Sequence, residues 1–226
     1  MRKWGIVITV LYAVIVLGLL VPAAIIISGA TDPLRTILST DLIAVYSEWL
    51  CVVPIAALLV GQAALLFLSV DTSFRKAKPR AHIAVSVIAG SMLFALLAIA
   101  IVLCVGFAVR GDKFQLADSE LGLFGIWLAL WLAWGIVFYF YFRNSSNAAG
   151  RVVSWLLKGS VLELLIAVPC HVIVRRRDEC SAPAFTSFGI VTGVAVMLLS
   201  FGPSVLLLYK KRLDAYSTHP SSSAAR

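Results

Sequence analysis

The chain has 226 residues, of which 61% are hydrophobic and 13% are charged, and its mean hydropathy is +0.99. Soluble domains are about 45–50% apolar and about 25% charged, so this composition excludes an ordinary soluble fold and indicates that lipid is the solvent of the apolar surface. The net charge of +8 arises mainly from short Lys and Arg clusters between apolar runs, a pattern typical of membrane topology signals and not of a nucleic-acid-binding domain.

The first apolar run follows Arg2 and Lys3 and covers residues 5–27. It is longer than the apolar core of a signal peptide, which is about 7–15 residues. We therefore predict that it stays in the protein as a signal anchor and forms the first spanning helix. Residues 28–30, Ser-Gly-Ala, resemble a cleavage site, so removal of this segment remains an alternative.

A membrane-spanning helix needs about 20 mostly apolar residues. Six segments reach or nearly reach this length and are predicted to form an all-α transmembrane bundle within a single domain, residues 1–213. These segments are residues 5–28, 50–70, 82–108, 122–142, 152–174 and 187–209. Residues 214–226 are rich in Ser and are predicted to be a disordered cytoplasmic tail. The connector before the second helix contains a further short helix or an early start of the second one, with Asp41 as its cap.

The distribution of Lys and Arg favours the side of the N-terminus, which predicts that both ends of the chain are cytoplasmic. The fifth segment is the least certain span. Its strictly apolar part, residues 160–174, rises only about 22 Å at about 1.5 Å per residue, and the hydrocarbon core is about 30 Å thick. The helix therefore either includes residues 152–159, with Lys158 extending to the inner headgroups, or re-enters the membrane. Charge counting does not separate these topologies, and we favour the full span.

A candidate polar site lies on this fifth segment. At 100° per residue, Ser160, Glu163 and Cys170 share one face of the helix, and His171 lies beside it. A charged carboxylate at membrane depth costs about 2.5 kcal/mol or more and usually faces the bundle interior or a wet cavity. Glu163 is therefore either part of a solute pathway or a packed acid, protonated or paired with a polar residue such as Gln62.

The four cysteines all fall towards the outer side of the predicted topology. An oxidising compartment would allow a disulfide between Cys170 and Cys180, or between Cys51 and Cys104. A metal or redox site formed by Cys170, His171 and Cys180 is a second hypothesis. The third is that the cysteines are free thiols that pack as small hydrophobic groups.

Arg175, Arg176 and Arg177 form an outer cluster that opposes the general charge distribution. Guanidinium groups bind phosphate and carboxylate through paired hydrogen bonds, so the cluster is a candidate anion or lipid-headgroup site. The alternative is that the arginines pair with nearby acids such as Asp178 and Glu179.

An aromatic stripe runs along one face of the fourth segment, formed by Trp127, Trp131, Trp134, Phe138 and Tyr141. Such a stripe either lines a groove for a pigment, quinone or lipid tail, or packs in the bundle and against lipid.

Small residues on two segments indicate close helix contacts. Gly189 and Gly193 form a small-residue face on the sixth segment, and Ser86 and Gly90 form a similar one on the third. The face with Gly189 and Gly193 is predicted to bind a partner membrane protein or a second copy of the chain.

Three functions fit these features. The favoured one is an accessory or structural subunit of a membrane complex. The alternatives are a small permease with a midplane polar site around Glu163, and an outer-face thiol or metal redox protein. The chain contains no Walker loop, HExxH or CxxC motif, so catalysis is not indicated and no cofactor is specified. The short loops favour a bacterial-type inner membrane.

Overall fold

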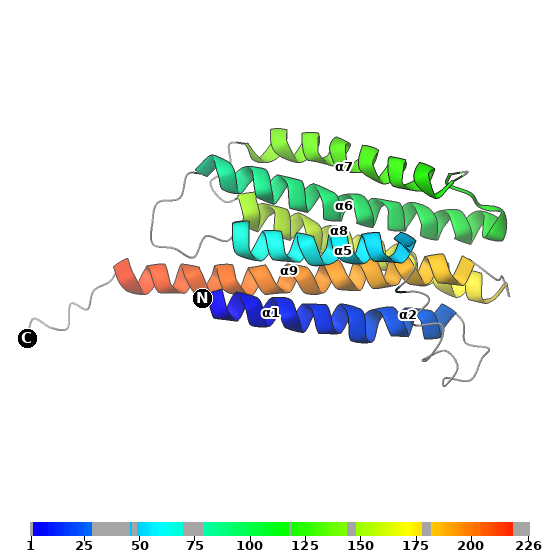
Figure 1. The fold of residues 1–226 in the computed structure, drawn as a ribbon, viewed down its shortest axis with the longest axis horizontal. Coiled ribbons are helices and arrows are strands. Elements are labelled where there is room, and N and C mark those ends of the chain that lie inside the picture. Colours follow the sequence, from blue (N-terminus) through cyan, green and yellow to red (C-terminus); the bar gives the residue numbers. More distant parts are fainter. Residues whose placement is uncertain are drawn as a thin grey trace, which may run out of the picture.

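The structure, a computed structural model, describes residues 2–28, 46, 49–69, 79–117, 119–143, 148–177 and 182–218. These residues form long helices that run side by side in one bundle, and none of them lies in a β-strand (Figure 1). The start of the first helix and the end of the last helix lie at the same end of the bundle (Figure 1). The predicted all-α fold is confirmed.

Each of the six apolar segments is helical. The elements in chain order are α1 (Arg2–Ile15), η1 (Val16–Leu20), α2 (Val21–Ser28), α5 (Trp49–Ala63), η3 (Ala64–Ser69), α6 (Pro79–Arg110), η4 (Gly111–Lys113), α7 (Glu120–Phe142), α8 (Ala148–Arg175) and α9 (Ala182–Thr218). The π-helical segments η1 and η3 continue the helices before them, so α1, η1 and α2 together make one crossing.

The helices have the length and composition that a bilayer requires. Among the described residues, five helices are long and apolar enough to span a membrane, and Cys51–Phe67 is a shorter apolar helix. Together with η3, this shorter helix runs from Trp49 to Ser69, or about 30 Å at about 1.5 Å per residue, which is long enough for the hydrocarbon core. The protein is therefore an all-α polytopic membrane protein. The described residues do not include Asp41, so the cap predicted there lies outside them.

Helix α8 is long enough for the predicted fifth span. It has 28 residues and continues through Pro169, so its length is about 42 Å at about 1.5 Å per residue. This exceeds the hydrocarbon core of about 30 Å and favours the full span over a re-entrant helix. Lys158 is exposed on its outer surface, as expected for a side chain that extends to the headgroups. At the other end of the chain, α9 continues to Thr218, into the segment predicted as a tail.

The loop after α6 links three helices at one end of the bundle. Gly111 adopts a positive φ of 63°, which ends α6 in a conformation that an L side chain rarely adopts. Ser119 caps α7, because its Oγ accepts a hydrogen bond from the Gly122 N–H at 3.1 Å. Asp112 caps α9, because its Oδ1 accepts from the Ala182 N–H at 2.9 Å. The ends of α6, α7 and α9 are thus fixed to one another.

Helix α8 packs between α6 and α9 and forms the centre of the bundle with them, while α7 packs mainly against α6 (Figure 1). Gly90 lies in the contact between α6 and α8, since a Cβ atom there would overlap the side chain of Val152. The small-residue face predicted on the third segment is therefore a helix contact. Large apolar side chains such as Leu132 and Leu165 cover the outer surface, which suits a lipid environment.

Candidate functional site

Glu163 lies in the interface between α8 and α9 and is 0% exposed. Its carboxyl group fits over two glycines of α9. A Cβ atom on Gly193 would overlap Oε2 and lie 2.9 Å from the carboxyl carbon, and one on Gly189 would lie 3.4 Å from Oε1. Gly189 and Gly193 are themselves buried, so the face predicted to bind a partner is occupied by the protein's own helices. The glycines provide the space for the acid.

Neither carboxyl oxygen of Glu163 has a hydrogen-bond partner among the described residues. A charge at this position would have no counterion there, and burial of an uncompensated charge is costly. Ser160, on the same face, is fully buried and donates from its Oγ to the Leu157 carbonyl at 2.9 Å within the helix. Gln62 is also buried, on α5, and its Oε1 has no partner in the described part of the chain. The structure thus gives no hydrogen bond between Gln62 and Glu163.

His171 is connected to α9 through Thr186. The His171 Nδ1 lies 2.8 Å from the Thr186 Oγ1, and this hydroxyl is 3.1 Å from the carbonyls of Ala182 and Pro183. The imidazole and the hydroxyl are both satisfied if the His171 Nδ1–H donates to the Thr186 Oγ1. The Thr186 hydroxyl then donates its own proton to one of the two carbonyls. The imidazole is therefore held by the first turn of α9.

Replacing Thr186 with Val is expected to destabilise the fold by about 1–3 kcal/mol, because it leaves the buried imidazole nitrogen without a partner. Unfolding in detergent, followed by circular dichroism, measures this. Thr192→Val is the matched control, because the Thr192 Oγ1 donates only within α9, to the Phe188 carbonyl at 2.9 Å. Equal effects of the two substitutions would mean that the contact with His171 does not stabilise the bundle.

Cys104 joins the site from α6. It is buried, and its Sγ lies 3.9 Å from the Thr186 carbonyl and against Gly189. Sequence patterns had placed Cys104 only at the outer end of a helix, and nothing local indicated that it faces Glu163 and α9. In the structure, Cys104 is a free thiol and makes no disulfide with Cys51. Cys180 lies outside the described residues, so its predicted disulfide and metal partners remain predictions. Among the residues that are described, no three His, Cys, Asp or Glu side chains gather as metal ligands.

Arg175, Arg176 and Arg177 are exposed at the end of α8. The N–H groups of Arg176 and Arg177 bond to carbonyls of the last turn of α8, so these residues close the helix. A positive charge there also interacts favourably with the C-terminal end of the helix dipole. The acids predicted as their partners, Asp178 and Glu179, lie outside the described residues.

The aromatic stripe of α7 mostly packs on α6. The Phe94 ring of α6 lies 4.5 Å from the Trp134 ring and 5.5 Å from the Phe138 ring. The Trp131 Nε1–H donates to the Ile88 carbonyl at 3.1 Å. Tyr141 is exposed, and Trp127 lines a cavity. The packing interpretation therefore fits most of the stripe, and the groove interpretation fits its outer end.

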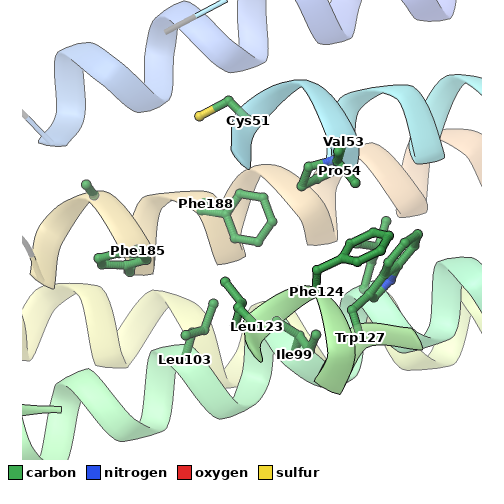
Figure 2. Close-up of a pocket in the computed structure, with 12 residues that line it drawn as sticks. Cys51, Val53, Pro54, Ile99, Leu103, Leu123, Phe124, Trp127, Phe185 and Phe188 are labelled. Atoms are coloured by element: carbon green, nitrogen blue, oxygen red, sulfur yellow. The ribbon is translucent and has the colours of Figure 1, made fainter. Parts of the chain in front are cut away.

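Two cavities lie near Trp127, at the end of the bundle that holds the loop after α6. One is an apolar groove of about 290 Å³ between α5, α6, α7 and α9 (Figure 2), and the other, of about 320 Å³, is lined by the loop that follows α6. Glu163, Cys170 and His171 line neither of them. The polar candidate site is therefore a packed interface, and the two described cavities lie elsewhere.

Comparisons of the chain with protein-family models, with curated proteins and with solved structures find no match. The fold and the site together define the class: a multi-pass integral membrane protein with polar groups packed between α6, α8 and α9.

Proposed function

We propose that this protein is a non-catalytic accessory or scaffold subunit of a membrane complex, in a bacterial-type inner membrane. The observation that supports this most is the position of Glu163, which is enclosed by Gly189 and Gly193 and lines neither cavity. A permease would need a polar cavity that reaches the acid. A redox protein would need its thiol and imidazole groups to be accessible, but His171 is buried against Thr186.

Helix α7 provides the surface that would contact another subunit. It lies at the edge of the bundle and packs mainly against α6 (Figure 1). Its outer face presents large apolar side chains, among them Ile136 and Phe140, which are 60% and 61% exposed. Aromatic and branched side chains on a peripheral helix suit contact with a helix of a partner membrane protein, where packing provides the binding free energy.

The test is purification of the tagged chain from its own membranes in a mild detergent. A partner in stoichiometric amount is expected to co-purify with the unmodified chain and to be lost from Ile136→Ala/Phe140→Ala. The matched control is Leu162→Ala/Leu165→Ala, which truncates exposed apolar side chains on α8 instead and is expected to keep the partner. Purification of the unmodified chain alone, or equal loss from both variants, would refute the proposal.

Reconstitution in liposomes addresses the permease alternative. An accessory subunit is expected to move no solute by itself. Solute uptake that is present in the unmodified protein and absent from Glu163→Gln would support the permease and contradict the accessory role.

A further inference from the structure

The groove between α5 and α7 is lined almost entirely by apolar atoms. Its lining residues are Cys51, Val53, Pro54, Leu96, Ile99, Leu103, Leu123, Phe124, Trp127, Ala184, Phe185 and Phe188. Figure 2 shows these side chains coming from four helices around a common space. A dry apolar cavity of about 150 Å³ is enough to bind benzene, and ligand pockets begin near 300 Å³. At about 290 Å³, the groove has room for several carbons of a hydrocarbon chain.

One hydrogen-bond donor beside the groove is unused. Trp127 is 9% exposed, and its Nε1–H has no acceptor among the described residues. The next tryptophan on the helix, Trp131, donates to the Ile88 carbonyl at 3.1 Å, so an unpaired indole is not a general property of this face. A buried donor without an acceptor costs about 1–3 kcal/mol. A rotation of the indole that turns its buried Nε1–H into the groove would let a ligand carbonyl oxygen accept the hydrogen bond and recover this free energy.

The second cavity continues the groove towards the end of the bundle. The two cavities share Leu103, Leu123 and Phe185 as wall residues. Beyond this shared wall, the second cavity is lined by the loop after α6, which supplies the polar side chains of Asp112, Gln115 and Ser119. We call this second cavity the polar cup. Because α6 ends at Arg110, the polar cup lies where the chain leaves the membrane.

The polar cup and the groove together match an amphiphile in polarity, because a polar end adjoins an apolar space. Among the described residues that line the polar cup, Asp112 is the one with a charged side chain. Its negative charge disfavours an anionic ligand group there. Gln115 is exposed and offers both a donor and an acceptor. Trp127 lies four residues after Leu123, which places it about 6 Å deeper along the helix at about 1.5 Å per residue. In a glycerolipid, the ester group also lies just below the headgroup, so Trp127 is at the depth of the ester.

We propose that the groove and the polar cup form one binding site for a glycerophospholipid of the surrounding bilayer. The first carbons of one acyl chain lie in the groove, the Trp127 indole turns to donate its hydrogen bond to the ester carbonyl, and a zwitterionic headgroup lies in the polar cup. The bilayer supplies this ligand, because the groove is lined by helices long and apolar enough to span the membrane and by the shorter apolar helix α5. This site is separate from the α7 face at Ile136 and Phe140 that is proposed to contact a partner.

Native mass spectrometry of the full-length protein, after extensive washing in detergent, tests the site. The unmodified chain is expected to retain one phospholipid. Leu123→Trp adds volume at the shared wall of the two cavities and is expected to reduce the retained lipid at least about tenfold. Leu132→Trp makes the same change on the exposed face of α7 and is expected to retain the lipid. An unmodified chain without lipid, or equal retention by both variants, would overturn the proposal.

Trp127→Phe keeps an aromatic ring in the groove and removes the indole donor. It is expected to weaken lipid binding by roughly two- to tenfold, the worth of one hydrogen bond, while leaving the unfolding transition in place. Titration with phosphatidylethanolamine and phosphatidylglycerol of the same acyl chains separates the headgroup from the chain. We expect tighter binding of the zwitterionic lipid. Tighter binding of the anionic lipid, or unchanged binding by Trp127→Phe, would overturn the assignment of the headgroup or of the carbonyl contact, respectively.

Discussion

Replacing Gly193 with Ala is expected to lower the free energy of unfolding by about 1–3 kcal/mol. The added methyl group would overlap Glu163 Oε2 and lie 2.9 Å from the Leu164 side chain, in an interface with no free space around the carboxyl group. A carboxyl group on the surface would rotate away, but Glu163 is 0% exposed and must push α8 from α9 instead. Unfolding by titration with a denaturing detergent, followed by circular dichroism, measures the change.

Gly125→Ala is the matched control for this substitution. Gly125 lies within α7, and a Cβ atom there would have no neighbour within 4 Å. Alanine favours the helix over glycine by up to about 1 kcal/mol, so this variant is expected to be as stable as the unmodified chain or slightly more stable. If Gly193→Ala behaves like Gly125→Ala, the interface between α8 and α9 is looser than the structure shows.

A double variant identifies the cause of the Gly193 effect. Glu163→Ala removes the carboxyl group that the new methyl group would overlap. The combined variant Glu163→Ala/Gly193→Ala is therefore expected to be more stable than the sum of the two single changes predicts, because the residues are in direct contact. Strict additivity would show that the methyl group is resisted by its other neighbour, the Leu164 side chain, and not by the acid.

Replacing Glu163 with Met is expected to stabilise the protein by about 1–3 kcal/mol. The two side chains have a similar length, but methionine removes two buried oxygens that have no hydrogen-bond partner among the described residues. The measurement is again the midpoint of unfolding in denaturing detergent. Glu163→Gln is the control, because glutamine keeps the shape of the side chain and its polar atoms, and it is expected to be less stable than Glu163→Met.

The opposite result would also be informative. If Glu163→Met is destabilising, the carboxyl group has a partner that offsets its burial, and a water-filled or ion-binding site around Glu163 would then be favoured over simple packing. Combined with loss of solute uptake in Glu163→Gln, it would support the permease. A stabilised Glu163→Met variant that still binds its membrane partner would instead support the accessory role.

Local composition determined the helices of this protein. A run of about 20 apolar residues can satisfy its backbone in lipid only by forming a helix, so the six segments could be predicted without knowledge of their neighbours. The fifth segment was uncertain for the same reason. Glu163 and Lys158 lower the hydropathy of α8, but one points into the bundle and the other lies exposed on its surface, so both fit a full span of 28 residues.

The sequence also indicated which residues of α8 stand out, but not what surrounds them. The face containing Ser160 and Glu163 could be predicted from the helical repeat, because residues three and four apart lie on one side of a helix. That this face meets Gly189 and Gly193, and not Gln62 or a partner protein, depends on how α8 and α9 pack. Helix packing in a membrane depends on the fit of side chains and not on hydropathy.

Only the tertiary structure brought Cys104 to Gly189 and connected His171 to Thr186. It also placed Trp127 in a groove formed by four helices, beside a loop whose polar side chains had shown no pattern. The sequence by itself therefore determined that the chain is an all-α multi-pass membrane protein, because the contact of each helix with lipid is a local property. The packing of distant helices decided which groups meet, because those contacts join residues that no local repeat relates.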